Sequence, residues 1–387
     1  MKLTPYGSTD TQKRRHEAIA LDLTALPTAA GREDRVQAYI DRWLARRKAT
    51  VRWCRDVDGN LLIQSKRSST KPPIFFTAHL DHPGFVVVDR PDPRTVVAEF
   101  RGGVMDAYFV GAKVEFFDST NTRFRGTVCA LAASEPFKCA SINLTRANTS
   151  IAPNDIGRWA FPPARWTKTL LKTNACDDLA AVAAALCAFD RIRARRGMGH
   201  VGLLFTVAEE VGFIGAIGAA QRTFVPKNAR LVCLENSRAS DECPLGAGPV
   251  VRVGDRMSVF SPTLTNTISD LARKYEAEHP SFTWQRKLMV GGACEATAFA
   301  ALGYQSTCLC LPLGNYHNME RIDEVKAGER PATVGQEFVH RSDYHGLIEL
   351  LEIIAANLDS TKSEMARRIA ELRTKRTHVL SPVDSPR

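Results

Sequence analysis

Side chains of metal-binding types stand at the ends of several short apolar runs of this chain, or at the start of a predicted helix. The set contains two imidazoles and three carboxylates and no thiolate: His79, Asp177, Glu210, Glu235 and His317. Such ligands suit zinc, cobalt or manganese. Two ions held close together need one carboxylate that bridges them and about two more protein ligands each. The five side chains therefore have the number and the types that a two-metal centre requires.

Two further carboxylates lie beside members of this set. Glu209 precedes Glu210, and it is a candidate for the group that accepts a proton from an attacking water. Asp81 comes shortly after His79, and on an extended chain their side chains point the same way. We therefore expect Asp81 to accept a hydrogen bond from one nitrogen of His79 and to fix its tautomer.

Each of these short patterns also has a purely structural explanation. A His-x-Asp pair can stand on a surface by accident, and the Asp177-Asp178 pair can cap a helix and interact with its dipole. A pair of glutamates is usually a solvated face, and His317 could be an ordinary loop histidine. The metal-centre hypothesis depends on the combination, because all of these groups stand at the ends of apolar elements.

The short apolar runs are typical of buried strands, and they cover residues 74–78, 201–207, 231–234 and 306–311. The segments around them predict helices over residues 16–26, 33–47, 178–193, 262–276, 293–302 and 342–358. This alternation predicts an α/β fold whose sheet is covered on both faces. Ligands of open α/β sheets bind at the carboxyl ends of the strands, so the five side chains would converge on one crevice if the strands are neighbours.

The texture of the sequence changes between about residues 88 and 168, where strand-like segments and turn residues replace helical ones. We therefore predict an inserted β-rich domain over residues 89–168, within a discontinuous catalytic domain formed by residues 1–88 and 169–387. A basic C-terminal extension begins at about residue 360. It contains a predicted amphipathic helix over residues 362–375 and a loose tail over residues 381–386.

The composition is that of an ordinary globular protein, since 44% of the 387 residues are hydrophobic and 24% are charged. No apolar run approaches the length of about 18 residues that a membrane-spanning helix needs, and the start lacks a secretory signal core. The ten cysteines include no Cys-x-x-Cys pair, so we expect a reducing, cytoplasmic location. The formal net charge of +10 could attract nucleic acid, but no nucleic-acid-binding motif accompanies it, so neither nucleic acid nor a membrane is an expected partner.

The motifs around these residues resemble those of metallopeptidase family 42, the tetrahedral (TET) aminopeptidases, whose clan also contains families 28 and 20. The resemblance covers about residues 17–358 and rests on Thr77-Ala78-His79-Leu80-Asp81, Asp177-Asp178, Phe205-Thr206-Val207-Ala208-Glu209-Glu210-Val211-Gly212, Gly291-Gly292 with Ala296, and Tyr316-His317-Asn318. The predicted insert lies between His79 and Asp177, where family 42 has its extra domain. Family 20 inserts its extra domain later, before the last histidine.

The resemblance implies a zinc-exopeptidase fold, which is a three-layer sandwich with a mostly parallel central sheet. It implies two ligand sets that share one carboxylate: His79, Asp177 and Glu235 for one ion, and Asp177, Glu210 and His317 for the other. Glu209 would be the general base, and Asp81 would orient His79. The expected cofactors are two divalent ions, zinc first, with cobalt or manganese as alternatives. The family also implies a homodimer formed through the inserted domain, and dimers that can close into a dodecamer.

Four residues, at three places in the chain, depart from the family pattern. Leu179 stands where an arginine usually follows the two aspartates, Glu235 replaces the usual aspartate, and Cys294-Glu295 replaces Thr-Asp. None of these changes removes a ligand. They leave the substrate preference open and indicate a divergent branch.

The sequence thus predicts a dinuclear-metal aminopeptidase that removes N-terminal residues from peptides through a metal-bound water, with Glu209 as the general base. One alternative keeps the chemistry and changes the substrate: a clan-related deacylase that acts on a small molecule. A second alternative is a non-catalytic binding or assembly module on the same fold. A decayed enzyme would be expected to lose ligands first, and no ligand is missing.

Overall fold

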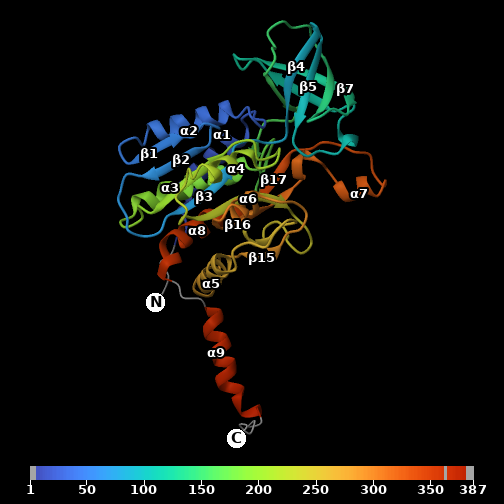
Figure 1. Cartoon of the computed structure of the whole chain (residues 1–387). Coiled ribbons are helices and arrows are strands. Elements are labelled where there is room, and N and C mark those ends of the chain that lie inside the picture. The colour runs from blue at the N-terminus through green and yellow to red at the C-terminus, as the bar shows by residue number, and fades with distance from the viewer. Residues whose placement is uncertain (1–5, 361–363, 381–387) are drawn as a thin grey trace.

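A large mixed sheet forms the centre of the molecule in the computed structural model, which describes residues 6–360 and 364–380 (Figure 1). Its strand order is β1-β2-β12-β3-β13-β16-β17-β11-β10, and β14 joins the sheet at β16 and carries β15 on its other side. Four central strands run parallel: β12 (Val201–Thr206), β3 (Ile74–His79), β13 (Arg230–Arg238) and β16 (Gln305–Gly314). These are the apolar runs that precede four of the five candidate ligands.

The remaining strands join this central group in antiparallel pairs, except that β14 and β15 are parallel to each other. Their bounds are β1 (Val51–Arg55), β2 (Leu61–Ser65), β10 (Arg165–Trp166), β11 (Leu170–Thr173), β14 (Val250–Gly254), β15 (Gln285–Leu288) and β17 (Glu337–His340). The prediction of a mostly parallel sheet was therefore wrong outside the four central strands. Parallel neighbours need a long crossover connection, whereas short turns join β1 to β2 and β10 to β11.

Helices cover both faces of the sheet through two separate hydrophobic clusters. One cluster includes residues of α1 (Asp10–Thr24), α2 (Asp34–Ala45), α3 (Leu179–Ala194), α5 (Pro262–Glu278) and α8 (Arg341–Asn357). The other includes residues of α4 (Ile214–Gln221) and α6 (Glu295–Ala301), together with Phe75 and Cys233. Side chains alternate along a strand, so His79 and Glu235 lie on this second face as well.

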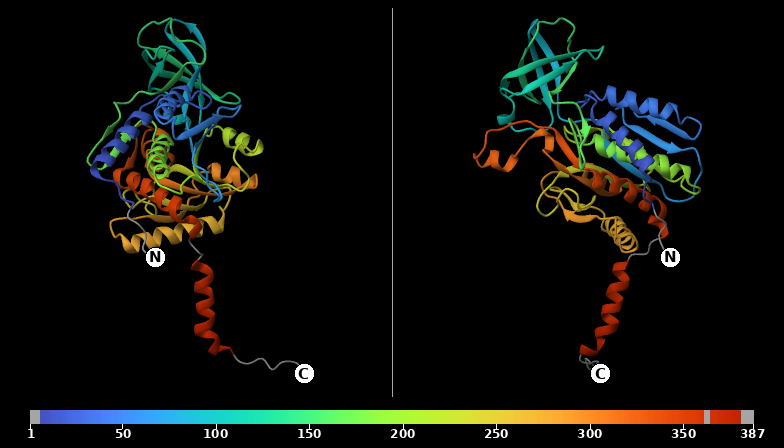
Figure 2. Two further views of the ribbon diagram at one scale, coloured as in Figure 1. Left: turned by 90° about the vertical axis from the view of Figure 1, so that its left-hand side faces the viewer. Right: turned by 180° about the vertical axis from the view of Figure 1, so that it is seen from behind.

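Six strands form a closed barrel that stands apart from the large sheet (Figures 1 and 2). Their order is β4-β5-β8-β7-β6-β9, with bounds β4 (Gly84–Asp92), β5 (Thr95–Arg101), β6 (Lys113–Phe117), β7 (Arg123–Ala132), β8 (Lys138–Leu144) and β9 (Ile156–Trp159). Its core is aromatic: the ring of Phe85 lies within 5.0 Å of the rings of both Phe100 and Trp159. The first barrel strand begins at Gly84, before the predicted start of the insert at residue 89. Strand β10 belongs to the large sheet, although it lies before the predicted end of the insert at residue 168.

Two elements differ from the sequence-based expectation in ways that have a local cause. Helix α1 begins at Asp10, well before residue 16, because Thr9 forms a capping box in which Gln12 N–H donates to Thr9 Oγ1 and Thr9 N–H donates to Gln12 Oε1. Strand β13 continues to Arg238 because it pairs with β16 along its whole length. Glu235 therefore lies inside a strand and not at its end.

The C-terminal helix α9 (Glu364–Arg376) extends away from the rest of the molecule (Figures 1 and 2). Its first turn touches α5, where Glu364 N–H donates to Asp270 Oδ2 at 3.2 Å. The short helix α7 (Ile322–Lys326) lies in the chain between β16 and β17. The predicted loose tail at residues 381–386 lies outside the described residues. All ten cysteines are free thiols, and within residues 6–360 and 364–380 no helix is long and apolar enough to cross a membrane.

Candidate metal centre

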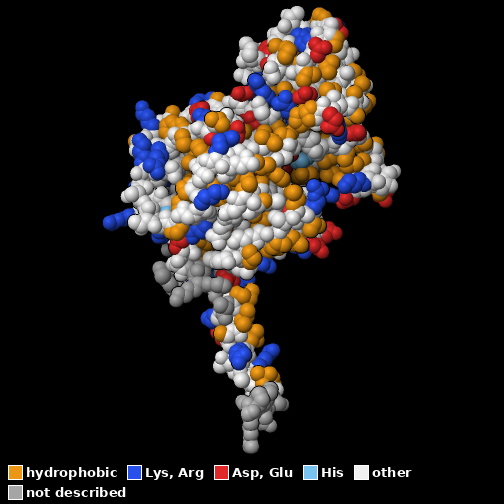
Figure 3. All heavy atoms as spheres, in the orientation of Figure 1, with side chains coloured by type: hydrophobic (Ala, Val, Ile, Leu, Met, Phe, Trp, Pro, Cys, Tyr) orange, Lys and Arg blue, Asp and Glu red, His pale blue; other side chains and the backbone are white. Residues whose placement is uncertain are grey.

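The predicted site residues converge where the central strands end, on the side of the large sheet that faces the barrel. His79 is the last residue of β3, Glu235 lies in β13, and His317 follows β16. The space-filling view shows a hollow between the barrel and the larger body, with a histidine side chain visible at its base (Figure 3). The barrel contributes to this region directly, because Gly103 O lies 2.7 Å from His317 Nδ1.

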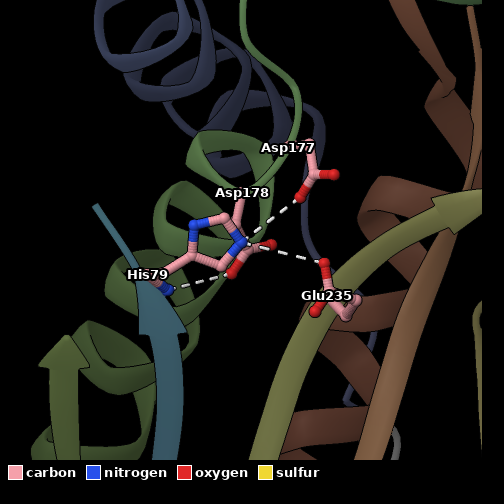
Figure 4. A group of neighbouring side chains, drawn as sticks. All are labelled: His79, Asp177, Asp178 and Glu235. Carbon is pink, nitrogen blue, oxygen red and sulfur yellow. Dashed lines mark hydrogen bonds and ion pairs between the residues drawn. The ribbon is translucent and has the colours of Figure 1, made fainter. Parts of the chain in front are cut away.

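One group of potential ligands surrounds the imidazole of His79 (Figure 4). His79 Nε2 lies 3.4 Å from Asp177 Oδ1 and 3.8 Å from Glu235 Oε1. All three residues are buried, with exposed fractions of 7% or less. On the other side of the ring, His79 Nδ1 lies 3.2 Å from the backbone carbonyl of Asp81 and therefore donates to it. In the neutral ring, this bond leaves the lone pair of Nε2 directed at the two carboxylates.

A second group shares Asp177 with the first. His317 Nε2 lies 3.5 Å from Asp177 Oδ2 and 3.3 Å from Glu210 Oε1. His317 Nδ1 donates to the carbonyl of Gly103, so its Nε2 also carries the free lone pair. The two oxygens of Asp177 thus face two different imidazoles. This is the arrangement that a carboxylate bridging two ions requires.

The residue types suit divalent cations, and among the described residues some of their buried oxygens have no hydrogen-bond partner, so a cation could take that place. Within the described part of the chain, no hydrogen bond reaches the buried atoms Asp177 Oδ1 and Glu210 Oε1. Buried carboxylate oxygens are costly to leave without a partner. Ligand atoms of each group lie within 4.8 Å of one another. Carboxylate and imidazole donors at this spacing suit zinc, cobalt or manganese.

Asp81 fixes the backbone of the adjacent Glu209 and Glu210. The N–H of Glu209 donates to Asp81 Oδ1 and the N–H of Glu210 donates to Asp81 Oδ2, both at 3.0 Å. The imidazole of His79 contacts the same carboxylate at 3.5 Å, although its hydrogen bond goes to the Asp81 carbonyl. Asp81 therefore lies beside His79 as expected, but its carboxylate mainly holds the turn that follows β12.

Glu209 and Glu210 have different neighbours. Glu210 Oε1 lies near His317, whereas Glu209 Oε2 lies 3.9 Å from His79 Nε2. Burial raises the pKa of Glu209 well above its usual value, and nearby Glu235 and Glu210 add to that shift. A buried carboxylate with a raised pKa beside the candidate ligands has the properties of a proton acceptor in catalysis.

The two imidazoles hold protons tightly when the site contains no cation. Burial lowers the pKa of His79, but the negative charges of Glu209 and of the other carboxylates around the ring together outweigh burial and raise it well above 6.5. Burial also lowers the pKa of His317, but Glu210, Tyr316 and Asp177 together outweigh burial and raise it well above 6.5. Burial raises the pKa of Glu235 to about 7. Cations that bind here must displace these protons.

The sequence did not assign several polar residues that support this cluster. Asp178 Oδ2 accepts the backbone N–H of His79, and its Oδ1 accepts from the side chain of Asn236. The side chain of Asn318 contacts the ring of His82, which also contacts the Asp177 carbonyl. The buried carboxylates of Glu295 and Glu337 also belong to these unassigned polar residues. Asp178 and Asn318 stand next to predicted ligands, so adjacency could have suggested them, whereas Glu337 has no such signal.

Two of the departures from the family pattern are buried beside the site. Leu179, at the start of α3, is fully buried in the hydrophobic cluster of that face. Glu295, in the first turn of α6, is also buried, and burial raises its pKa to about 7. Both residues are therefore buried parts of the surroundings of the cluster, and neither is a candidate ligand.

Comparison with known proteins gives a matching family model and several structures of similar fold. The model of the family described as M42 glutamyl aminopeptidase matches residues 143–329. No curated protein sequence matches the chain. Aminopeptidase APDkam598 from the archaeon Desulfurococcus kamchatkensis superposes with a TM-score of 0.72 at 20% identity, covering 92% of this chain and 98% of the other.

Two further solved structures are similar. The TET1 peptidase of Pyrococcus horikoshii, which can assemble into a tetrahedron or a large octahedral shell, gives a TM-score of 0.69 at 21% identity, over 89% of this chain and 99% of that one. The TET aminopeptidase of the marine sediment archaeon Thaumarchaeota archaeon SCGC AB-539-E09 gives a TM-score of 0.72 at 18% sequence identity. The match covers 89% of this chain and 97% of that one. At these identities the likeness shows the fold.

The fold, with its mixed sheet and separate barrel, is that of peptidases of the aminopeptidase class. The match to the M42 model over residues 143–329 agrees with the resemblance to metallopeptidase family 42 that the motifs indicated, and it supports an aminopeptidase hydrolase.

Proposed function

We propose that this protein is a two-metal aminopeptidase that removes residues from the N-termini of peptides. The observation that carries the proposal is the position of Asp177, whose two oxygens lie 3.4 Å and 3.5 Å from the Nε2 atoms of two different buried histidines. His79 and Glu235 would complete one ion's ligands, and His317 and Glu210 the other's. Zinc is the first candidate by donor type, with cobalt or manganese as alternatives.

Two bound ions would polarise the scissile carbonyl and lower the pKa of a water in the site. Glu209 would take the proton of the attacking water and deliver it to the departing amine. Its burial supports this role, because burial raises the pKa of this carboxylate and so makes it a stronger proton acceptor. Asp81 would keep Glu209 and Glu210 in their separate positions through its two backbone hydrogen bonds.

We further propose that residues 89–168 act as an assembly domain within a catalytic domain of residues 1–88 and 169–387. The support is the closed barrel of β4 to β9, which has its own aromatic core, and the assemblies formed by the TET1 peptidase. A homodimer is the expected minimum. Light scattering that gives a monomer at micromolar concentration would contradict this proposal.

The activity is tested on protein stripped of metal and then reconstituted separately with zinc, cobalt and manganese. A panel of aminoacyl amides and of N-acylated small molecules would be assayed with each form. We expect release of free amino acids from the amides, dependent on added metal. Turnover restricted to the N-acyl compounds would show a deacylase instead, and two bound ions without turnover on either panel would favour a binding module.

A further inference from the structure

Glu337, a buried carboxylate at the start of β17, contacts the backbone of two separate segments. One segment carries Asp177, and the other carries His317. Glu337 Oε2 accepts hydrogen bonds from the N–H groups of Cys176 at 2.7 Å and Asp177 at 3.0 Å. Its Oε1 accepts from the N–H of His317 at 2.9 Å. The residue is completely buried. A single rigid group thus spans the distance between these two segments.

The sheet topology explains why this one residue can reach both segments. Strand β17 lies between β16 and β11, with Leu313 opposite Val339 on one side and Thr173 opposite Glu337 on the other. The chain that leaves β11 leads to Asp177, and the chain that leaves β16 leads to His317. The first residue of β17 therefore stands between two loops that diverge from its neighbouring strands.

The loop that carries His317 needs such an external contact. Asn315, His317 and Asn318 all have left-handed backbone conformations, with φ values of 54°, 52° and 63°. Residues with a side chain rarely adopt this region, and they persist in it only where surrounding contacts hold them. The bond from His317 N–H to Glu337 is one of these contacts, since it engages the backbone of the ligand itself.

We propose that Glu337 is a positioning residue that sets the separation between Asp177 and His317, so that both can bind the same ion. This inference rests on the proposed two-metal function. Without Glu337, the two loops would lose one of their common anchors, since His82 and Asn318 also link them. The ion shared by Asp177, Glu210 and His317 would then bind more weakly. The ion held by His79 and Glu235 would be less affected, because the backbone of His79 is held by Asp178 instead.

The test compares Glu337→Gln with the control Asp343→Asn. Glutamine has nearly the same shape, but its amide nitrogen cannot accept a hydrogen bond. Asp343 is likewise completely buried and accepts two backbone N–H bonds, from Gly246 at 2.7 Å and Gly248 at 2.8 Å, but it contacts none of the candidate ligands. Both variants lose one buried carboxylate charge, so the pair separates general destabilisation from an effect on the metal centre.

Cobalt would be titrated into each metal-free protein and followed by its visible absorption, with chelator competition to give the two affinities. We expect Glu337→Gln to bind the second cobalt at least about 10-fold more weakly than wild type, the scale seen when groups behind metal ligands are lost. Asp343→Asn should melt at a lower temperature but keep both affinities. Glu337→Asp, whose shorter carboxylate cannot span both loops, provides the same test if the glutamine variant does not fold.

Wild-type affinities for both ions in the Glu337 variants would overturn the inference while leaving the proposed function intact. Equal losses in Asp343→Asn would also overturn it, since the effect would then be one of overall stability. A wild-type protein that takes up fewer than two ions would instead refute the two-metal function, and the inference with it. The wild-type titration therefore distinguishes the two failures.

Discussion

Glu209 and Glu210 are adjacent in the chain, yet their carboxylates face different histidines. Replacing Glu209 by glutamine keeps its shape and removes the proton acceptor. We expect kcat to fall by about 10²-fold or more, the usual scale for losing acid–base assistance, while metal content and folding are retained. Glu210→Gln should lose an ion instead. Steady-state kinetics with metal analysis of both variants would check the assignment, and near-normal turnover of Glu209→Gln would reverse it.

The protonation of the candidate ligands predicts how metal binding depends on pH. His79 and His317 have raised pKa values, and burial raises the pKa of Glu235 to about 7. His79 and His317 hold protons in the metal-free protein, Glu235 does so below about pH 7, and each proton must leave before an ion binds. Apparent metal affinity should therefore weaken as the pH falls through about 7, by roughly tenfold per pH unit for each proton displaced.

Chelator competition with zinc at several pH values on either side of neutrality would measure this dependence. An affinity that stays constant across that interval would mean that these groups are already deprotonated without metal. It would also remove the support that the raised pKa of Glu209 gives to its role as a base.

At the scale of elements, a buried ion pair inside the barrel holds the arginine that contacts the α/β body. Glu115 of β6 is 1% exposed, and Arg158 Nε of β9 lies 3.0 Å from its carboxylate. Arg158 Nη1 also donates to the carbonyl of Ala25, just after α1. Arg123 lies 3.4 Å from the same carboxylate but is half-exposed, so it can replace only part of this interaction.

Arg158→Met should therefore destabilise the protein by roughly 3 kcal/mol, because it leaves Glu115 buried without its main partner. The double variant Arg158→Met with Glu115→Leu should recover much of this loss, since no charge then remains buried. Denaturant unfolding followed by Trp fluorescence would measure both. If the single variant loses less than about 1 kcal/mol, the buried pair contributes little to the stability of the folded protein.

At the scale of the whole molecule, helix α9 stands apart from the catalytic body. Its apolar residues Met365, Ile369 and Leu372 are each at least 50% exposed, and its first turn bonds to Asp270 of α5. None of the candidate ligands lies on α9 or contacts it. Deleting residues 361–387 should therefore leave kcat/KM within about twofold and the metal content unchanged. A large loss of activity would show that the extension takes part in the site, directly or through assembly.

Much of the candidate site could be predicted from sequence because it depends on short-range order. His79 with Asp81, Asp177 with Asp178, and Glu209 with Glu210 are neighbours in the chain, and each pair directly follows an apolar element or opens one. The α/β class and the β-rich insert also follow from local patterning, since helix and strand periodicities differ over a few residues. The start of α1 was missed because a capping box at Thr9 outweighs the weak apolar pattern of its first turns.

Only the tertiary structure decided which distant side chains meet. Glu337 reaches Asp177 and His317 because β17 is inserted between β16 and β11, and strand order cannot be deduced from the composition of a strand. The same long-range pairing makes the sheet mixed and places Glu235 inside β13. Gly103 of the barrel reaches His317 for a similar reason. The sequence by itself therefore determined the chemistry of the ligands, while packing between elements determined how those ligands are held.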